Sequence, residues 1–221
     1  LKDAYPLPRI DDSLDALSGS AWFSSLDLAS GYWQVEMNPD DRQKTAFSTG
    51  SGLYEFNVMP FGLTNAPSTF ERLMELVLAG LHWKTCLVYL DNILIYAQTF
   101  EEHASRLTEV FARLARAGLK LKPKKCTLFQ KEVAYLGHVV SAKGVATDPE
   151  KTRKVREWPT PSNVKEVRSF VGLCSYYRRF IKDFARLAAP LHKLTQKDVR
   201  FKWTPECEHA FQVLKVKLTS T

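Results

Sequence analysis

Apolar and polar residues alternate along this chain in patterns that predict both strands and helices. Residues 87–90 and 93–96 are two short apolar runs rich in β-branched side chains, which are typical of buried strands. Asp91 and Asn92 stand between the runs, and we predict that they form the two-residue turn of a hairpin. A third strand-like run, residues 21–27, also ends in an aspartate. The pattern therefore predicts carboxylates at the ends of two buried strands.

The remaining patterns predict mixed α/β structure up to about residue 145 and helices after it. Further strands are predicted over residues 45–49, 53–59 and 132–141. The predicted helices cover residues 8–17, 67–79, 99–118, 164–174 and 176–184, and two more begin at the Asp148 and Thr204 caps. Pro159 and Pro161 mark a boundary before the last group of helices.

The composition is that of a globular protein, with 45% hydrophobic and 25% charged residues among 221. No apolar run approaches the ~20 residues that a membrane span needs, so no membrane partner is expected. The four cysteines lack metal-finger spacing and are interpreted as free, mostly buried thiols in a reducing compartment. The chain begins with neither Met nor a signal-peptide pattern, and we expect it to come from a longer polypeptide.

The net charge of +7 is unevenly distributed along the chain. Residues 1–100 hold 6 Lys and Arg against 12 Asp and Glu, a net charge of −6, and residues 101–221 hold 25 against 12, a net charge of +13. A solvated, lysine-rich face is the simpler explanation of the basic half. A charge of this size nevertheless favours a polyanionic partner such as nucleic acid.

Asp27 and Asp91 are the candidate metal ligands. Magnesium takes oxygen ligands, usually one or two protein carboxylates with substrate phosphates and water, and a pair of ions can catalyse phosphoryl transfer. Each aspartate also has an ordinary alternative, because Asp91 can simply form a turn and Asp27 can cap a helix. An unrelated metal-dependent hydrolase would use the same two carboxylates.

Four segments occur in an order and spacing that identify a family. They are Phe-Ser-Ser-Leu-Asp-Leu-Ala-Ser-Gly-Tyr-Trp-Gln at residues 23–34, Met-Pro-Phe-Gly-Leu-Thr-Asn-Ala-Pro at 59–67, Val-Tyr-Leu-Asp at 88–91 and Tyr-Leu-Gly-His at 135–138. Together they closely resemble the reverse transcriptases of gypsy-type LTR retrotransposons and retrovirus-related Pol polyproteins. The resemblance covers essentially the whole chain.

The resemblance implies an α+β fold of the right-hand polymerase type. Residues 1–145 would form partial fingers and a palm with an antiparallel sheet and helices. Residues 146–200 would form an α-rich thumb or connection segment. Residues 201–221 would begin the tether to an RNase H-like domain whose catalytic part, and with it RNA cleavage, is absent here.

The resemblance also implies roles for individual residues. Asp27 and Asp91 would bind two Mg²⁺ ions, with Mn²⁺ as a possible substitute. Tyr32, Phe61 and Gly62 would contact the incoming nucleotide, Tyr32 as a steric gate against the 2′-hydroxyl. The primer grip would be Leu136, Gly137 and His138, and the residues facing duplex phosphates would be Lys122, Lys124, Lys125, Arg178 and Arg179.

Without the resemblance, these residues have ordinary explanations. Tyr32 would be a half-buried helix aromatic, Phe61 and Gly62 part of a turn leaving a strand, and His138 a hydrogen-bonded surface histidine. The lysines and arginines would be a solvated surface.

One position departs from the family pattern Tyr-x-Asp-Asp, because Asn92 stands where the second Asp is expected. An amide keeps a carbonyl oxygen but loses the negative charge, which weakens Mg²⁺ binding. The resemblance predicts an RNA-directed DNA polymerase core. The departure at Asn92 favours the alternative, an impaired or inactive nucleic-acid-binding remnant. The basic residues that hold the nucleotide triphosphate in the family lie upstream of this chain, which also favours the remnant.

The resemblance implies a set of partners and a location. The partners would be an RNA or DNA template with a primer, deoxynucleoside triphosphates, and the RNase H, protease and integrase parts of the same polyprotein. The location would be intracellular, in a cytoplasmic virus-like particle with possible nuclear access.

Overall fold

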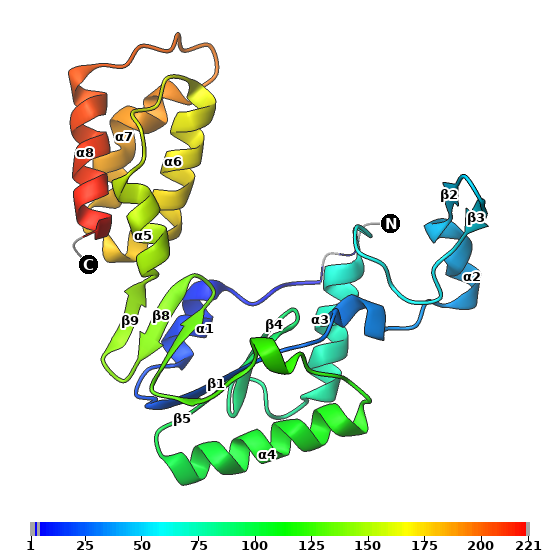
Figure 1. Ribbon diagram of the computed structural model, residues 1–221. Helices are drawn as coiled ribbons and strands as arrows, with labels where there is room; N and C mark the ends of the chain where they lie inside the picture. The colour runs from blue at the N-terminus through cyan, green and yellow to red at the C-terminus, as the bar shows by residue number, and fades with distance from the viewer. Residues whose placement is uncertain (1–2, 4, 220–221) are drawn as a thin grey trace. The chain divides into compact units, whose positions relative to one another are not determined.

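The computed structural model describes residue 3 and residues 5–219, and these fall into two compact units. The first unit runs up to Leu136 and includes Val140–Gly144. The second comprises Gly137–Val139 and the chain from Val145 onward. Figure 1 traces both units along the chain.

A four-stranded antiparallel sheet organises the first unit. Its strands are β1 (Trp22–Asp27), β4 (Cys86–Tyr89), β5 (Asn92–Ala97) and β6 (Thr127–Gln130). Their order across the sheet is β4-β5-β1-β6, so the hairpin β4–β5 lies beside β1. The three apolar runs recognised in the sequence are therefore neighbours, whereas β6 was not predicted.

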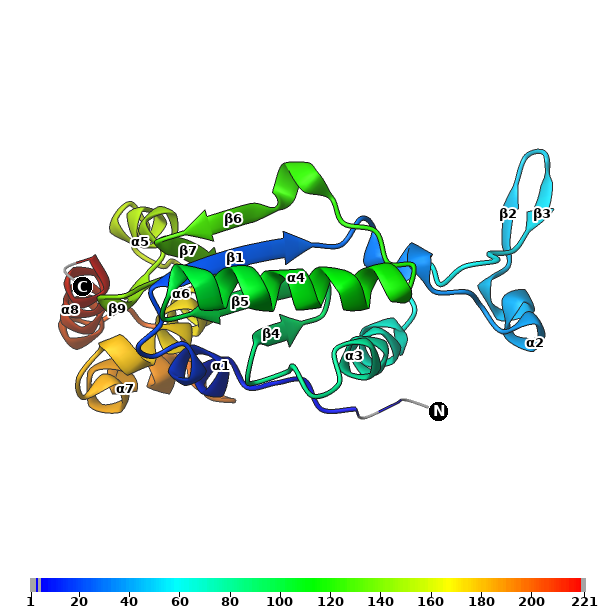
Figure 2. The ribbon, with the colours of Figure 1, turned by 90° about the horizontal axis from the view of Figure 1, so that it is seen from below.

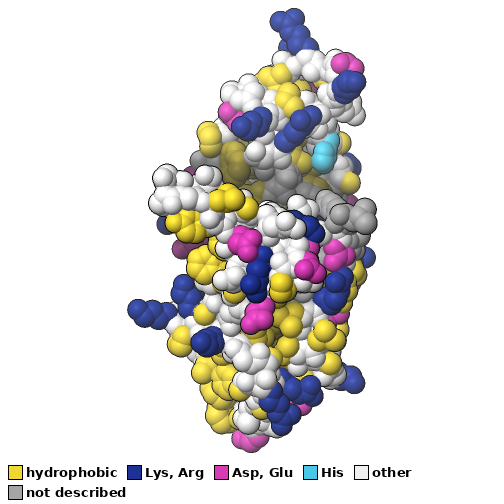
Figure 3. Space-filling view, turned by 90° about the vertical axis from the view of Figure 1, so that its right-hand side faces the viewer, with side chains coloured by type: hydrophobic (Ala, Val, Ile, Leu, Met, Phe, Trp, Pro, Cys, Tyr) yellow, Lys and Arg dark blue, Asp and Glu magenta, His cyan; other side chains and the backbone are white. Residues whose placement is uncertain are grey.

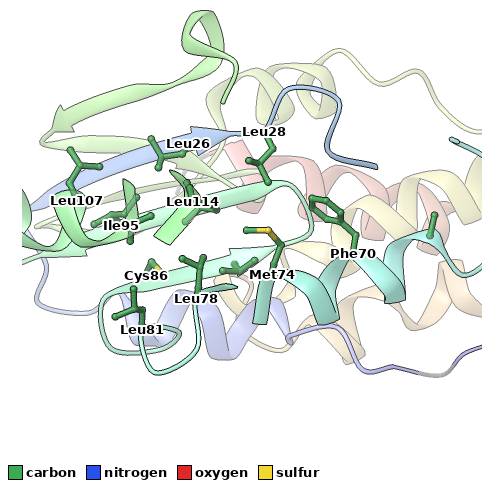
Figure 4. Close-up of a cluster of buried hydrophobic side chains, with 14 of the residues drawn as sticks. Leu26, Leu28, Phe70, Met74, Leu78, Leu81, Cys86, Ile95, Leu107 and Leu114 are labelled. Carbon is green, nitrogen blue, oxygen red and sulfur yellow. The ribbon is translucent and has the colours of Figure 1, made fainter. Parts of the chain in front are cut away.

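Two amphipathic helices cover one face of this sheet. They are α3 (Ala66–Val77) and α4 (Phe100–Arg116), close to the predicted bounds, and α4 runs along the sheet in Figure 2. The Thr99 hydroxyl caps α4 by accepting a 3.2 Å hydrogen bond from the Glu102 amide. Figure 4 shows the apolar stripes of both helices interlocking with Leu26, Leu28 and Ile95 in one buried cluster.

The smaller elements of the first unit are shorter than predicted. The helix α1 covers Ile10–Ala16, and the hairpin expected at residues 45–59 is reduced to β2 (Phe47–Thr49) and β3 (Gly52–Tyr54). All six hairpin residues are exposed, so no core supports a longer pairing. A short helix not predicted from the sequence, α2 (Pro39–Arg42), precedes the hairpin.

The predicted turn at Asp91-Asn92 is wrong by one residue. Tyr89 pairs with Asn92, so Leu90 and Asp91 form the turn and Asn92 is the first residue of β5. Both β4 and β5 are almost entirely buried, so apolar alternation does not determine their register. The pairing of β5 with β1 fixes it instead.

The second unit is a bundle of four helices. They are α5 (Pro149–Arg156), α6 (Val164–Tyr176), α7 (Phe184–Leu194) and α8 (Pro205–Thr219). The predicted caps are confirmed, because Asp148 accepts from the Glu150 amide at 2.9 Å and Thr204 accepts from the Cys207 amide at 3.4 Å. Residues of α8 such as Phe211 and Leu214 are fully buried in the bundle core, so this part of the expected tether is integral to the unit.

The helix predicted over residues 176–184 is wrong. That segment holds only the 3₁₀ turn η4 (Arg178–Phe180), and the next helix is α7. Asp183 adopts a left-handed φ of 61° immediately before α7, which a continuous helix does not allow. The apolar spacing suggested one helix because Tyr177 and Ile181 are both buried, although the backbone between them is not α-helical.

A three-stranded sheet contains the points where the chain changes units. Its strands are β7 (Glu132–Tyr135), β8 (His138–Ser141) and β9 (Gly144–Thr147), in that order. The strand-like stretch at residues 132–141 is therefore a hairpin, and β9 was missed.

The prediction of free, mostly buried thiols is confirmed among the described residues. All four cysteines are free thiols, and three of them are buried. Across residues 3 and 5–219, no helix combines the length and apolar character that crossing a bilayer requires.

A buried polar contact connects three elements of the first unit. The Ser24 hydroxyl of β1 lies 2.6 Å from Nε2 of His103 in α4 and accepts a 3.0 Å hydrogen bond from the Phe129 amide of β6. His103 is 0% exposed, and burial, together with nearby Arg106, lowers its pKa below the usual 6.5. The imidazole is therefore neutral in the folded protein near neutral pH.

We expect His103 to make stability fall as the pH is lowered. Below pH 6.5 the unfolded chain binds a proton at this residue that the folded protein does not accept until a lower pH. His103→Gln should therefore lose less stability than the wild type between about pH 7.5 and about pH 5 in denaturant unfolding. Substitution of exposed His192 by Gln is the control, and equal slopes for both variants would contradict the assignment.

Candidate active site

The strand register brings the predicted metal ligands to one rim of the sheet. Asp27 at the end of β1 pairs directly with Asn92, and the Leu28 amide donates a 3.2 Å hydrogen bond to the Asp91 carbonyl. Residues directly opposite in a sheet project to the same face, so Asp27 and Asn92 share a face. Leu26 points to the other face, into the cluster formed with α3 and α4.

The turn that carries Asp91 is held by a buried glutamate. Leu90 has a left-handed φ of 56°, and its amide donates to Oε2 of Glu71 in α3 at 2.9 Å. Glu71 is 0% exposed, and its Oε1 has no hydrogen-bond partner among the described residues. Burial raises the pKa of Glu71, while the bond from Leu90 opposes that shift.

The sequence prediction missed Glu71 although a signal was present. Glu71 lies three residues before Met74 and seven before Leu78, so it shares the buried face of a helix whose stripe was recognised. A charged residue in such a stripe needs a specific partner. The partner is the turn of the β4–β5 hairpin.

An aromatic group lies beside the Asp91 turn. Tyr32, in the 3₁₀ helix η1 (Gly31–Gln34), has its ring 5.3 Å from that of Phe61 and 5.4 Å from that of Phe70. Burial first, and then the charge of Asp91, raises the pKa of Tyr32. The structure therefore places two of the predicted nucleotide-binding residues, Tyr32 and Phe61, together, with Tyr32 near Asp91.

Gly31 makes this close approach possible. A Cβ added at Gly31 would lie 2.8 Å from Cζ of Phe70 and 3.3 Å from Cβ of Asp91. Any side chain here would therefore push the Asp91 turn and the aromatic ring apart.

Phe61 and Gly62 also border a cavity of about 400 Å³. Its lining residues are Trp33, Lys44, Thr45, Ala46, Phe56, Pro60, Phe61, Gly62 and Leu63. An ammonium group and exposed aromatic rings at one cavity suit a ligand with both charge and a planar ring.

One of the predicted basic residues contacts a predicted metal ligand. Nζ of Lys125 lies 3.0 Å from Oδ2 of Asp27, and the Lys122 amide donates to the Asp27 carbonyl at 2.8 Å. Lys122, Lys124 and Lys125 are all exposed, on or next to the 3₁₀ turn η3 (Pro123–Lys125). The basic turn is thus fixed to the end of β1.

Gln34 attaches the start of this basic segment to η1. Its Nε2 donates to the carbonyls of Ala29 and Lys120 at 2.8 and 2.9 Å, and its Oε1 accepts from the Lys120 amide at 2.7 Å. Gln34 belongs to one of the family motifs but was not assigned a role.

The residues of the predicted primer grip and the two predicted duplex-binding arginines lie at or beyond the point where the chain enters the second unit. Leu136 is the last residue of the first unit before that point, and Gly137, His138, Arg178 and Arg179 belong to the second. The interpretation of His138 as a surface residue is wrong, because it is 1% exposed and its ring packs against Tyr176, Tyr177 and Phe180. Arg178 and Arg179 are exposed.

The donor set at the rim suits a hard divalent cation. The chain offers the carboxylates of Asp27 and Asp91, both partly exposed, and the amide oxygen of Asn92. Magnesium is commonly held by one or two carboxylates together with water and substrate phosphates. Within residues 3 and 5–219, no cluster of three or more His, Cys, Asp or Glu side chains is arranged for a metal.

The excess positive charge is not concentrated in one patch on the face seen in Figure 3. There, Lys and Arg side chains are interspersed with Asp and Glu.

The fold is that of the right-hand polymerases, with the antiparallel sheet as its palm. The chain belongs to the family described as reverse transcriptase (RNA-dependent DNA polymerase), whose model matches residues 1–140.

Curated relatives of the chain are polyproteins of transposable elements. It is 41% identical over 218 residues to the retrovirus-related Pol polyprotein from transposon 412 and 42% identical over 191 residues to that from transposon gypsy, both of Drosophila melanogaster. It is 37% identical over 216 residues to the transposon Tf2-7 polyprotein of Schizosaccharomyces pombe. These matches cover 99%, 86% and 98% of the chain but only 18%, 18% and 16% of the relatives.

Solved structures with the same fold include foamy viral protease-reverse transcriptases. The foamy viral protease-reverse transcriptase dRH in complex with double-stranded DNA matches with a TM-score of 0.91 at 26% identity, over 100% of this chain and 39% of that chain. The complex with an RNA/DNA hybrid matches with a TM-score of 0.86 at 27% identity, over 98% and 30%. The predicted α+β right-hand polymerase fold is confirmed.

We expect Glu71→Leu to loosen the turn that carries Asp91. Leucine keeps the volume but leaves the Leu90 amide without its acceptor, at a cost of ~1–3 kcal/mol, so this amide should exchange with solvent about 5- to 150-fold faster. Hydrogen exchange measured by NMR would show this.

Glu71→Gln is the matched control, because it keeps an acceptor oxygen and removes only the charge. It should leave the Leu90 amide protected. If both variants exchanged at the wild-type rate, Glu71 would not support the turn.

Proposed function

We propose that this chain is the polymerase core of a retrotransposon reverse transcriptase, which adds deoxynucleotides to a primer 3′-hydroxyl on an RNA or DNA template. The observation that carries the proposal is the pairing of Asp27 with Asn92, which brings Asp27 and Asp91 to one rim of the sheet beside Tyr32. Membership of the reverse transcriptase family supports it.

Asp27 and Asp91 would hold two divalent ions, Mg²⁺ or Mn²⁺, with Asn92 as a weaker neutral ligand. When bound, these ions would activate the primer hydroxyl and neutralise charge on the phosphates. The chain itself supplies position: Glu71 fixes the Asp91 turn, and Lys125 sets the orientation of the Asp27 carboxylate.

Tyr32, Phe61 and Gly62 would form the nucleotide pocket. The Tyr32 ring is supported by Phe61 and Phe70, so its position is well determined. A rigid aromatic ring beside the carboxylates can exclude a 2′-hydroxyl by its volume, which selects deoxynucleotides over ribonucleotides.

The remaining predicted residues would hold the duplex. Lys122 and Lys124 are exposed ammonium groups on the first unit, and Arg178 and Arg179 are exposed on the second. Leu136, Gly137 and His138 would grip the primer, with the backbone of the turn as the contacting group because His138 is buried.

Asn92 favours a second candidate function, a nucleic-acid-binding remnant with little catalysis. Its position on the shared face with Asp27 makes the lost charge directly relevant to metal binding. The two functions share one fold and one binding mode, and they differ in the rate of chemistry alone.

We expect Asn92→Asp to raise the rate of primer extension on an RNA template by about 10²- to 10³-fold, since it restores a charged ligand. It should also tighten Mn²⁺ binding measured by electron paramagnetic resonance. Asn57→Asp, which adds the same charge at an exposed position outside the predicted site residues, is the control and should change neither quantity. Equal effects of the two substitutions would remove Asn92 as the cause of impairment.

We expect binding of a primer–template duplex to weaken steeply with salt, because lysines that neutralise phosphates release counterions. Lys122→Ala and Lys124→Ala should each reduce the slope of log affinity against log salt by about 1. Lys84→Ala, an exposed lysine outside the predicted set, should leave the slope unchanged. A flat salt response of the wild type would argue against both candidate functions.

The proposal extends to partners and location. Because the relatives are several times longer, the RNase H, protease and integrase parts of a common polyprotein are proposed as covalent neighbours. The site of action would be a cytoplasmic virus-like particle with possible access to the nucleus.

A further inference from the structure

The turn between β7 and β8 is built from two residues in the left-handed region. Leu136 has a φ of 45° and Gly137 a φ of 70°, as in a tight two-residue hairpin. Glycine adopts this conformation freely, but for leucine it is strained, so the turn needs support from outside its own strands.

That support comes from Tyr177, the C-cap residue of α6. Its hydroxyl donates a 2.6 Å hydrogen bond to the Gly137 carbonyl, and the side chain is 1% exposed. Burial and, secondarily, Asp148 raise the pKa of Tyr177 to about 12, so the hydroxyl stays protonated and available as a donor.

Aromatic packing reinforces the same attachment. The His138 ring lies 5.3, 5.2 and 5.8 Å from the rings of Tyr176, Tyr177 and Phe180. A Cβ at Gly137 would lie 3.4 Å from the Tyr177 hydroxyl, so the backbone of the turn is in close contact with that side chain.

The division of the chain into units agrees with these contacts. Gly137–Val139 group with the helices from Val145 onward, although the strand before them and Val140–Gly144 after them belong to the first unit. The turn is thus grouped with the helices, whereas the strand before it is grouped with the first unit.

We propose that Tyr177 is a positioning residue that fastens the Gly137 turn to the helical unit, so that the turn follows the helices and not the palm strands. Resting on the proposed function, this means that the helical unit sets the position of the primer 3′-terminus. Tyr177 acts through its hydrogen bond to the turn.

The attachment of the Gly137 turn to Tyr177 is tested by removing the Tyr177 hydroxyl group. In Tyr177→Phe, amide exchange of His138 and Val139, followed by mass spectrometry or NMR, should be about 2- to 13-fold faster, the range for one hydrogen bond. The matched control is Tyr135→Phe. Tyr135 is buried next to the turn, and its hydroxyl has no hydrogen-bond partner among the described residues, so exchange should not change. Equal exchange rates in the two variants would contradict the proposal that the Tyr177 hydroxyl holds the Gly137 turn.

The role at the primer needs a separate measurement. A fluorescent base analogue at the primer 3′-terminus reports its position, and the salt-dependent affinity of the duplex reports phosphate contacts. Tyr177→Phe should shift the fluorescence toward that of the free duplex while changing affinity by less than about twofold. Wild-type fluorescence in this variant would overturn the positioning role.

The two measurements separate this proposal from the proposed function. If the wild-type chain bound no primer–template duplex, the proposed function would fail and the primer role with it. The comparison of amide exchange between Tyr177→Phe and Tyr135→Phe would still decide whether Tyr177 holds the turn in place.

Discussion

The register between β1 and β5 is the constraint on which the candidate site depends. It pairs Asp27 with Asn92 and leaves Leu90 and Asp91 as the turn beside it. A slip by one residue would move Asp27 to the face covered by α3 and α4, and the carboxylates would separate. Burial of Leu26 against those helices opposes such a slip, so the hydrophobic core determines the geometry of the polar site.

Much of the fold was predictable because its signals are local. The stripes of α3 and α4 and the caps at Thr99, Asp148 and Thr204 each depend on residues within a few positions of one another. The misses have non-local causes. The register of the β4–β5 turn is determined by β1, and β6 exists as a strand because β1 has an open edge for it. Neither the turn segment nor the β6 segment contains a residue pattern that reveals its pairing with β1.

The site shows the same division between what was and was not predictable. Asp27 and Asp91 were recognised from their places at the ends of predicted strands and Tyr32 from a family pattern, and the fold brings the backbones of the two aspartates together, with the Tyr32 ring near Asp91. Glu71 and Tyr177 were missed, although each supports a turn that carries predicted residues. Their partners are backbone groups 19 and 40 positions away, and a backbone amide or carbonyl leaves no trace in the residue types of the sequence.

The three hydrogen bonds of Gln34 have a mechanical consequence. They join two stretches of backbone 86 positions apart through one uncharged side chain. A thermal fluctuation that opens the loop around Lys120 must also strain η1, and with it the neighbouring Tyr32 ring. The Tyr32 ring and the lysine turn that follows Lys120 are therefore expected to fluctuate together.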